Sequence, residues 1–173
     1  MKPSYLVKGF PGHPLHPPLT DATIGAYTAA TAFAVLAAVG VSEENLTKAW
    51  WLALLVGLAF TAPTALTGLA DWLGISRGTP LWRTATAHMV SMLLATALFA
   101  LAAAFGHARY VSGEMTTRAL VGTLLGLALL TLGGWLGGSV VFVHGMRVLN
   151  LVDEPARRAA APGGSEKDEA EGA

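Results

Sequence analysis

The sequence predicts an all-α integral membrane protein, built as an up-down bundle of four helices. The first observation behind this prediction is the composition. Apolar residues make up 53% of the 173 residues and charged residues only 13%, whereas about 25% of the residues in an average soluble domain are charged. The second observation is that the charged residues lie between four long apolar runs. Each run is close to the ~20 residues that a helix needs to cross a bilayer.

The four apolar runs span residues 22–42, 49–70, 84–106 and 119–143, and they contain no Asp, Glu, Lys or Arg. Their one histidine is His88. A soluble bundle would carry charged side chains along the outer face of each helix. The absence of charge over whole runs therefore predicts four transmembrane spans.

Proline, glycine and capping residues suggest the bounds of the first two helices. We expect the first helix to begin near Pro17 and Pro18, because proline suits the first helical turn. It should end near Val41. The second helix should begin after Ser42 and run to about Leu73, where a glycine follows.

The third and fourth helices are predicted in the same way. Thr79 and Pro80 suit the cap and first residue of the third helix, which should end near Gly106. The fourth should begin around Thr117 and run past Phe142. The connections are short, so neighbouring helices should be antiparallel.

We divide the chain into an N-terminal His/Pro strap at 1–16, the four-helix domain at 17–150, and a disordered cytoplasmic tail at 151–173. Both termini are expected in the cytoplasm, because Lys and Arg gather on the cytoplasmic side of membrane proteins. The side that holds the termini carries Lys2, Lys8, Arg77, Arg83, Arg147, Arg157, Arg158 and Lys167. The other side carries only Lys48, Arg109 and Arg118.

Composition also excludes several classes of function. The chain has no cysteine, which excludes disulfides, thiolate metal ligands and haem attached through cysteine. The net charge is zero and no basic run suggests nucleic acid. The N-terminus does not read as a signal peptide, so the first helix is expected to act as the insertion signal.

Most of the polar residues near the membrane are predicted to converge at the cytoplasmic end of the bundle. They come from all four helices or their flanks: His13, His16, Asp21, Asp71, Arg77, Arg83, His88, His144 and Arg147. Asp21 suits the first turn of its helix, where the dipole favours an anion. Asp71 lies at the other end of its helix, where the dipole disfavours an anion. We expect it to have a cationic partner, with Arg77, Arg83 or His88 as the candidates.

Two of the histidines attract attention by their positions. His88 lies about 9 Å along its helix from Trp82, at a depth where an ionisable residue usually faces the bundle interior and is a candidate for function. His144 continues a stripe of glycines along the fourth helix, formed by Gly122, Gly126, Gly133 and Gly137. Such a stripe is typical of close helix–helix contact, and it would also let a flat cofactor approach the backbone.

The other helices show lines of small or polar residues that predict a tightly packed interior. On the second helix this line is Thr64, Thr67, Gly68 and Asp71. On the first helix it is Asp21, Gly25, Thr28 and Ala32.

Three stretches resemble a bacterial membrane protein family, catalogued as domain of unknown function 2231. They are GHPLHPPL at 12–19, the residues around His88, and GWLGGSVVFVHG at 134–145. The resemblance covers roughly residues 9–150 and implies a four-helix domain in the bacterial cytoplasmic membrane. Some members of the family are joined to Rieske-type or cytochrome-like domains, which implies membrane redox work. A Rieske centre needs cysteines that this chain lacks, so a redox partner would be a separate protein.

The first functional hypothesis is a b-type haem used for membrane electron transfer. His88 and His144 are the first choice of axial ligands, and His13 and His16 are alternative ligands or propionate contacts. Arg83 or Arg147 would also be available to the propionates. The second is a bare transition-metal ion, in an enzyme or a sensor, held by His13, His16, His88 and His144 with either Asp71 or Asp21.

The third hypothesis is a non-catalytic membrane scaffold, whose polar cluster only ties helix ends together. A transporter is the weaker fourth, because no charged residue lies at the bilayer midplane. The sequence leaves enzyme activity and homo-oligomerisation undecided.

Overall fold

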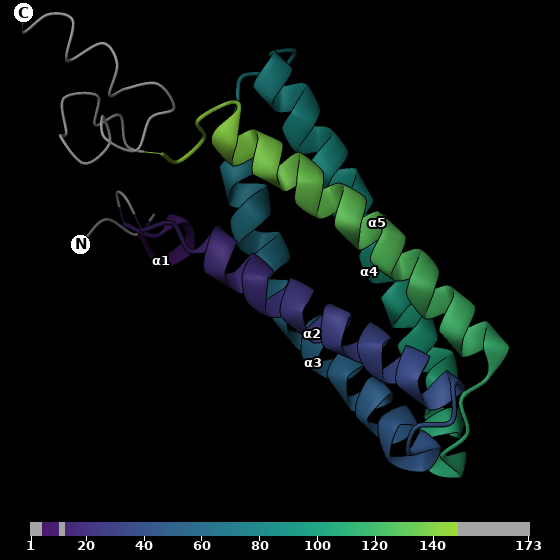
Figure 1. Ribbon diagram of the computed structural model, residues 1–173. Helices are drawn as coiled ribbons and strands as arrows, with labels where there is room; N and C mark the ends of the chain where they lie inside the picture. Colours follow the sequence, from purple (N-terminus) through teal and green to yellow (C-terminus); the bar gives the residue numbers. More distant parts are fainter. Residues whose placement is uncertain (1–4, 11–12, 149–173) are drawn as a thin grey trace, which may run out of the picture.

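The structure is a computed structural model that describes residues 5–10 and 13–148 (Figure 1). Its helices are α1 (Tyr5–Lys8), α2 (His16–Ala38), α3 (Glu43–Trp72), α4 (Pro80–Ser112) and α5 (Thr117–Phe142). The described residues form no strand beyond one isolated backbone pairing between Phe10 and His13. The helices α2 to α5 are each long and apolar enough to cross a membrane. The predicted all-α, four-helix membrane bundle is therefore confirmed. The predicted tail at 151–173 lies outside the described residues.

Most helix bounds agree with the sequence prediction. Pro17 and Pro18 lie in the first turn of α2, and the Thr79 hydroxyl caps α4 by accepting a hydrogen bond from the Trp82 amide at 3.1 Å. The end of α4 was predicted wrongly, because the helix continues past Gly106 to Ser112. A change from apolar to charged residues marks the edge of a membrane span, but a helix can extend beyond the membrane. Here it stops only at Gly113, whose φ of 74° is left-handed.

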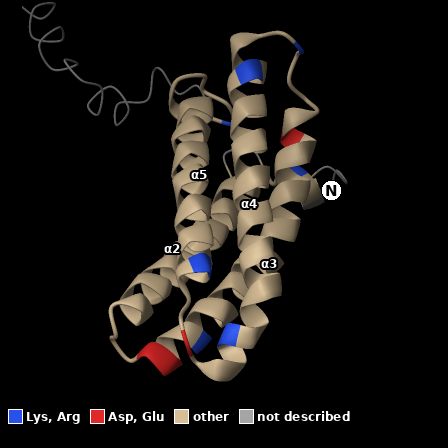
Figure 2. Cartoon of the chain, turned by 90° about the vertical axis from the view of Figure 1, so that its right-hand side faces the viewer, with Lys and Arg blue, Asp and Glu red and all other residues tan. Residues whose placement is uncertain are grey.

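The bundle consists of two helical hairpins. Helix α2 packs mainly against α3, and α4 packs mainly against α5. We call the end where α2 and α4 begin the polar end, and the opposite end the loop end. Figure 2 shows the charged residues gathered toward these two ends, whereas the central parts of the helices are free of charge. This pattern is the one expected of a bilayer-spanning bundle.

Aromatic side chains hold the two hairpins together. The Tyr27 ring of α2 stacks on the Phe99 ring of α4, with centroids 4.1 Å apart, and both rings are fully buried. Trp50 of α3 is also fully buried, and its Nε1 donates a hydrogen bond to the Thr123 hydroxyl of α5 at 3.0 Å. Stacked aromatic rings and a paired indole N–H make this interface specific as well as apolar.

The interior face of α2 differs from the prediction. Asp21, Gly25, Thr28 and Ala32 are all exposed on the outside of the bundle. The buried face carries instead Thr23, Tyr27, Ala30, Thr31, Ala34 and Ala37. The predicted line on α3 is correct, since Thr64, Thr67 and Asp71 are buried. The interior face of α2 was predicted wrongly because small residues on a membrane helix can face lipid as well as protein.

The glycine stripe on α5 provides close contact with α4. A Cβ added at Gly133 would lie 2.5 Å from the Met92 sulfur, and one added at Gly137 would lie 2.9 Å from Cε1 of His88. At Gly126 it would lie 2.9 Å from two ring atoms of Phe99. These glycines allow the two helices to approach closely.

We expect Gly126→Ala to destabilise the fold by about 1–3 kcal/mol, because the Phe99 ring is buried against Tyr27 and cannot move aside. Gly122→Ala is a matched control on the same helix, since nothing lies within 4 Å of the added Cβ. It should be neutral or stabilise by up to ~1 kcal/mol through helix propensity. Unfolding of both variants in mixed detergent micelles measures the difference, and equal effects would contradict the packing described.

Candidate functional site

His16 is the first residue of α2, and its ring is fixed against α3. Its Nδ1 lies 3.0 Å from the backbone oxygen of Thr64 and 3.3 Å from the hydroxyl of Thr67. The ring fits over Gly68, where an added Cβ would lie 2.6 Å from Cε1. A backbone carbonyl only accepts hydrogen bonds, so Nδ1 carries a proton and donates it. In the neutral ring, Nε2 then keeps its lone pair.

One further contact concerns Nε2 of His16. The Thr20 hydroxyl lies 3.5 Å from this nitrogen, but it also donates to the backbone oxygen of His16 at 2.9 Å. The second contact is the shorter by 0.6 Å, so Nε2 has at most a long hydrogen bond from Thr20.

His88 is fixed in the same way within the second hairpin. Its Nδ1 donates to the backbone oxygen of Gly133 on α5 at 2.7 Å, and its ring lies over Gly137. Among the described residues, Nδ1 is the ring nitrogen that makes a hydrogen bond, so Nε2 has no partner there. The two histidines thus share one arrangement, with a proton on Nδ1 and a lone pair on Nε2.

The two rings meet across the interface between the hairpins. The centroids of His16 and His88 are 6.4 Å apart, and the ring planes are inclined by 81°. Each ring is hydrogen-bonded inside its own hairpin, His16 between α2 and α3 and His88 between α4 and α5. A ligand between the rings would therefore touch both hairpins at once.

His144 lies just beyond α5 and contacts the first turns of α4. Its Nε2 is 3.0 Å from the hydroxyl of Thr84, which lies one turn before His88. Because the Thr84 hydroxyl donates to the backbone oxygen of Pro80 at 3.1 Å, Nε2 of His144 is the donor to Thr84. The structure thus places the ring of His88 beside that of His16, whereas the hydrogen bond of His144 is with Thr84.

The remaining predicted site residues lie apart from this pair. His13 is exposed, and its backbone pairs with Phe10 through hydrogen bonds of 3.1 and 2.9 Å. Together with the helical turn α1, this pairing gives local structure to the part of the N-terminal strap that is described. Arg83 is exposed at the start of α4. Within the described part of the chain, no group of three or more His, Cys, Asp or Glu could hold one metal ion, so the five predicted ligands are not assembled.

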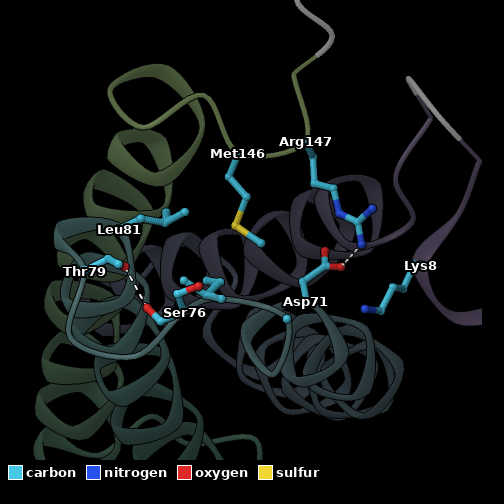
Figure 3. A pocket seen from close by; sticks show the side chains of 9 residues that line it. Lys8, Asp71, Ser76, Thr79, Leu81, Met146 and Arg147 are labelled. Atoms are coloured by element: carbon cyan, nitrogen blue, oxygen red, sulfur yellow. Dashed lines mark hydrogen bonds and ion pairs between the residues drawn. The ribbon is translucent and has the colours of Figure 1, made fainter.

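Asp71 is buried near the end of α3 and forms an ion pair with Arg147 (Figure 3). The helix dipole correctly predicted that this carboxylate needs a cation, but all three candidates, Arg77, Arg83 and His88, were wrong. Gly145 and Arg147 have left-handed φ values of 66° and 62°. The chain turns there, after α5, and carries the guanidinium across to α3. No periodicity in the sequence reports such a turn.

A set of hydroxyl contacts between α2 and α3 was not predicted. The hydroxyls of Thr23 and Thr64 are 3.0 Å apart, and the Tyr27 hydroxyl is 2.9 Å from that of Thr61. Hydroxyl groups in a membrane interior bond either to a neighbouring helix or to their own backbone. The sequence signal for them is the recurrence of Thr at helical spacing on both helices.

The four apolar helices and their polar end define an α-helical, multi-pass membrane protein. Residues 12–150 match the model of the family described as "Predicted membrane protein (DUF2231)", and the chain belongs to this family. The resemblance seen in the sequence is thereby confirmed. Searches of curated proteins and of solved structures gave no match.

Proposed function

We propose that this chain is a small membrane haem protein that transfers electrons. In this proposal His16 and His88 would hold the iron of one b-type haem between the two hairpins. The observation that carries the proposal is the pair itself, formed by two rings from different hairpins that each donate Nδ1–H to a backbone carbonyl.

The hydrogen bonds and the spacing of the two imidazole rings fit the binding of a haem iron. Histidines that bind metals usually donate their other ring N–H to a carbonyl or carboxylate, which fixes the tautomer and orients the ring. Two imidazoles on opposite sides of one metal, each at about 2 Å from it, have ring centres about 6–7 Å apart. The observed separation is 6.4 Å.

Haem fits the described residues better than a bare metal ion does. A bare zinc or copper ion usually takes three or four protein ligands, and the described residues bring no such group together. A porphyrin supplies four ligands itself, so two histidines are enough. When bound, the haem would supply one-electron chemistry. The residues of this chain hold the two rings in place.

The surroundings of the pair complete the proposal. Arg83 is exposed at the polar end and is available to a propionate, whereas Arg147 is already paired with Asp71. The excess of Lys and Arg at the polar end supports a cytoplasmic position for this end in a bacterial inner membrane. Because the chain has no cysteine, we propose a separate protein as the redox partner.

One observation favours a second candidate, the non-catalytic scaffold. The hydrogen bonds from His16 to Thr64 and from His88 to Gly133 each tie two helices together. They would serve that purpose without any ligand. In that case the histidines contribute to stability alone.

A haem titration separates the two candidates. Haemin added to the detergent-purified protein should bind saturably at one haem per chain and give a six-coordinate, low-spin absorption spectrum that sharpens on reduction. Circular dichroism before the titration verifies that the protein is helical. A folded protein that shows no saturable change would reject the haem proposal and leave the scaffold.

A further inference from the structure

A pocket of about 580 Å³ lies at the polar end, between α1, the connection from α3 to α4, and the segment after α5 (Figure 3). None of the four histidines at this end lines it. It is therefore separate from the pair formed by His16 and His88, and the proposed haem does not account for it.

One part of the pocket wall is cationic. Lys8 and Arg147 line it together with the Asp71 carboxylate. The carboxylate is paired with one guanidinium nitrogen of Arg147, while Lys8 has no ion pair within 4 Å among the described residues. The three side chains sum to one positive charge, and the other guanidinium N–H groups remain available as donors.

The other part of the wall is apolar, formed by Ile75, Leu81 and Met146. Figure 3 shows Leu81 and Met146 on one side of the pocket and Lys8 on the other, with Asp71 and Arg147 near Lys8. A small soluble anion would use only the cationic part. An anion joined to an apolar chain would use both.

The pocket lies at the ends of the spanning helices, which is where lipid headgroups are expected. It opens at helix ends, and the rings of Trp72 and Trp82 lie nearby on α3 and α4 with centroids 6.1 Å apart. Tryptophan is enriched at this depth, because its ring is apolar and its N–H is polar.

From these observations we infer that the pocket binds the phosphate of an anionic phospholipid. Lys8 and Arg147 contact the phosphate, and Ile75, Leu81 and Met146 contact the glycerol and the first part of the acyl chains. Basic pockets between transmembrane helices bind anionic headgroups in this way. A bound lipid would contact both α1 and the segment after α5. These two segments are far apart in the sequence but meet at the polar end.

Native mass spectrometry of the full chain in detergent tests this inference, with phosphatidylglycerol, phosphatidylcholine and free glycerol phosphate as probes. The wild-type chain should bind phosphatidylglycerol better than the other two. Lys8→Gln should weaken phosphatidylglycerol binding about fivefold, the usual contribution of one cation near a membrane surface. Lys8 was chosen because its removal leaves the ion pair of Asp71 intact.

Arg77→Gln is the matched control, since it removes one positive charge from an exposed position at the same end that does not line the pocket. It should leave phosphatidylglycerol binding unchanged. Equal losses in the two variants, or equal binding of both lipids, would overturn the site. Free glycerol phosphate binding as tightly as the lipid would overturn a lipid ligand. Each of these results is independent of haem binding, because the two sites share no residue.

Discussion

Replacing either His16 or His88 by alanine is expected to abolish the low-spin haem spectrum, whereas His144→Ala is expected to retain it. Loss of one axial ligand leaves an iron with a single histidine, which lowers affinity and changes the spin state. His144→Ala should leave the haem spectrum unchanged, because Nε2 of His144 is hydrogen-bonded to the Thr84 hydroxyl. Absorption spectra of the oxidised and reduced variants, titrated with haemin, measure the difference.

Alanine at either position also removes a tie between helices, so a second substitution is needed to separate ligation from stability. His88→Asn places a side-chain amide N–H near the position of Nδ1, where it can still donate to the Gly133 carbonyl. We expect this variant to keep most of its stability and to lose the haem spectrum. His107→Ala, at the loop end, is the control for removing a histidine elsewhere. Retention of haem by His16→Ala together with its loss in His144→Ala would show that His88 and His144 are the ligands instead.

Trp50→Ala is expected to have the largest effect on stability, about 3–5 kcal/mol. The indole is fully buried, donates to the Thr123 hydroxyl at 3.0 Å, and lies against Gly106 of α4. Its removal leaves a cavity where the two hairpins meet. The Thr123 hydroxyl loses the indole donor but still donates to the Ala119 backbone oxygen. Unfolding of the variant in mixed detergent micelles measures the loss.

Two substitutions serve as controls for Trp50→Ala. Trp135→Ala removes the same side chain from an exposed position on α5, and should change the free energy of unfolding by less than about 0.5 kcal/mol. Trp50→Phe keeps most of the ring and loses the hydrogen bond, so its cost should be smaller than that of alanine. If Trp135→Ala cost as much as Trp50→Ala, the interface between the hairpins would not lie where we describe it.

The architecture was predictable because a bilayer requires each spanning helix to be long and free of charged residues. Charge-free runs of sufficient length report the spans directly, and Thr79 with Pro80 marked the start of α4 through capping chemistry. The close approach of α4 and α5 was predictable from Gly126, Gly133 and Gly137, since glycines at helical spacing serve few other purposes in a membrane helix.

The histidine pair was harder to predict, because it depends on where α2 begins and how it is rotated. His16 was assigned to a strap before the helix, but it is the first residue of α2. Its spacing of 7 from Thr23 and 11 from Tyr27 places it on the buried face of the same helix. This spacing could have placed His16 on the buried face. It was missed because the sequence prediction put a different face of α2 toward the interior.

The partner of Asp71 shows a different limit. Helix dipole arguments reveal that a charge is needed at a helix end, but not which residue supplies it. Arg147 reaches Asp71 only because two left-handed residues turn the chain after α5. Such a choice among several nearby cations is made by the path of the backbone, which local sequence patterns do not report.

Electron paramagnetic resonance of the haem-loaded, oxidised protein tests the central claim most directly, because the signal reports both the spin state and the axial ligands of ferric iron. The account predicts a low-spin signal from two imidazoles. Because the ring planes are inclined by 81°, the signal should have the strong anisotropy of nearly perpendicular ligands. A high-spin signal, or a low-spin signal that persists unchanged in His16→Ala, would contradict the account.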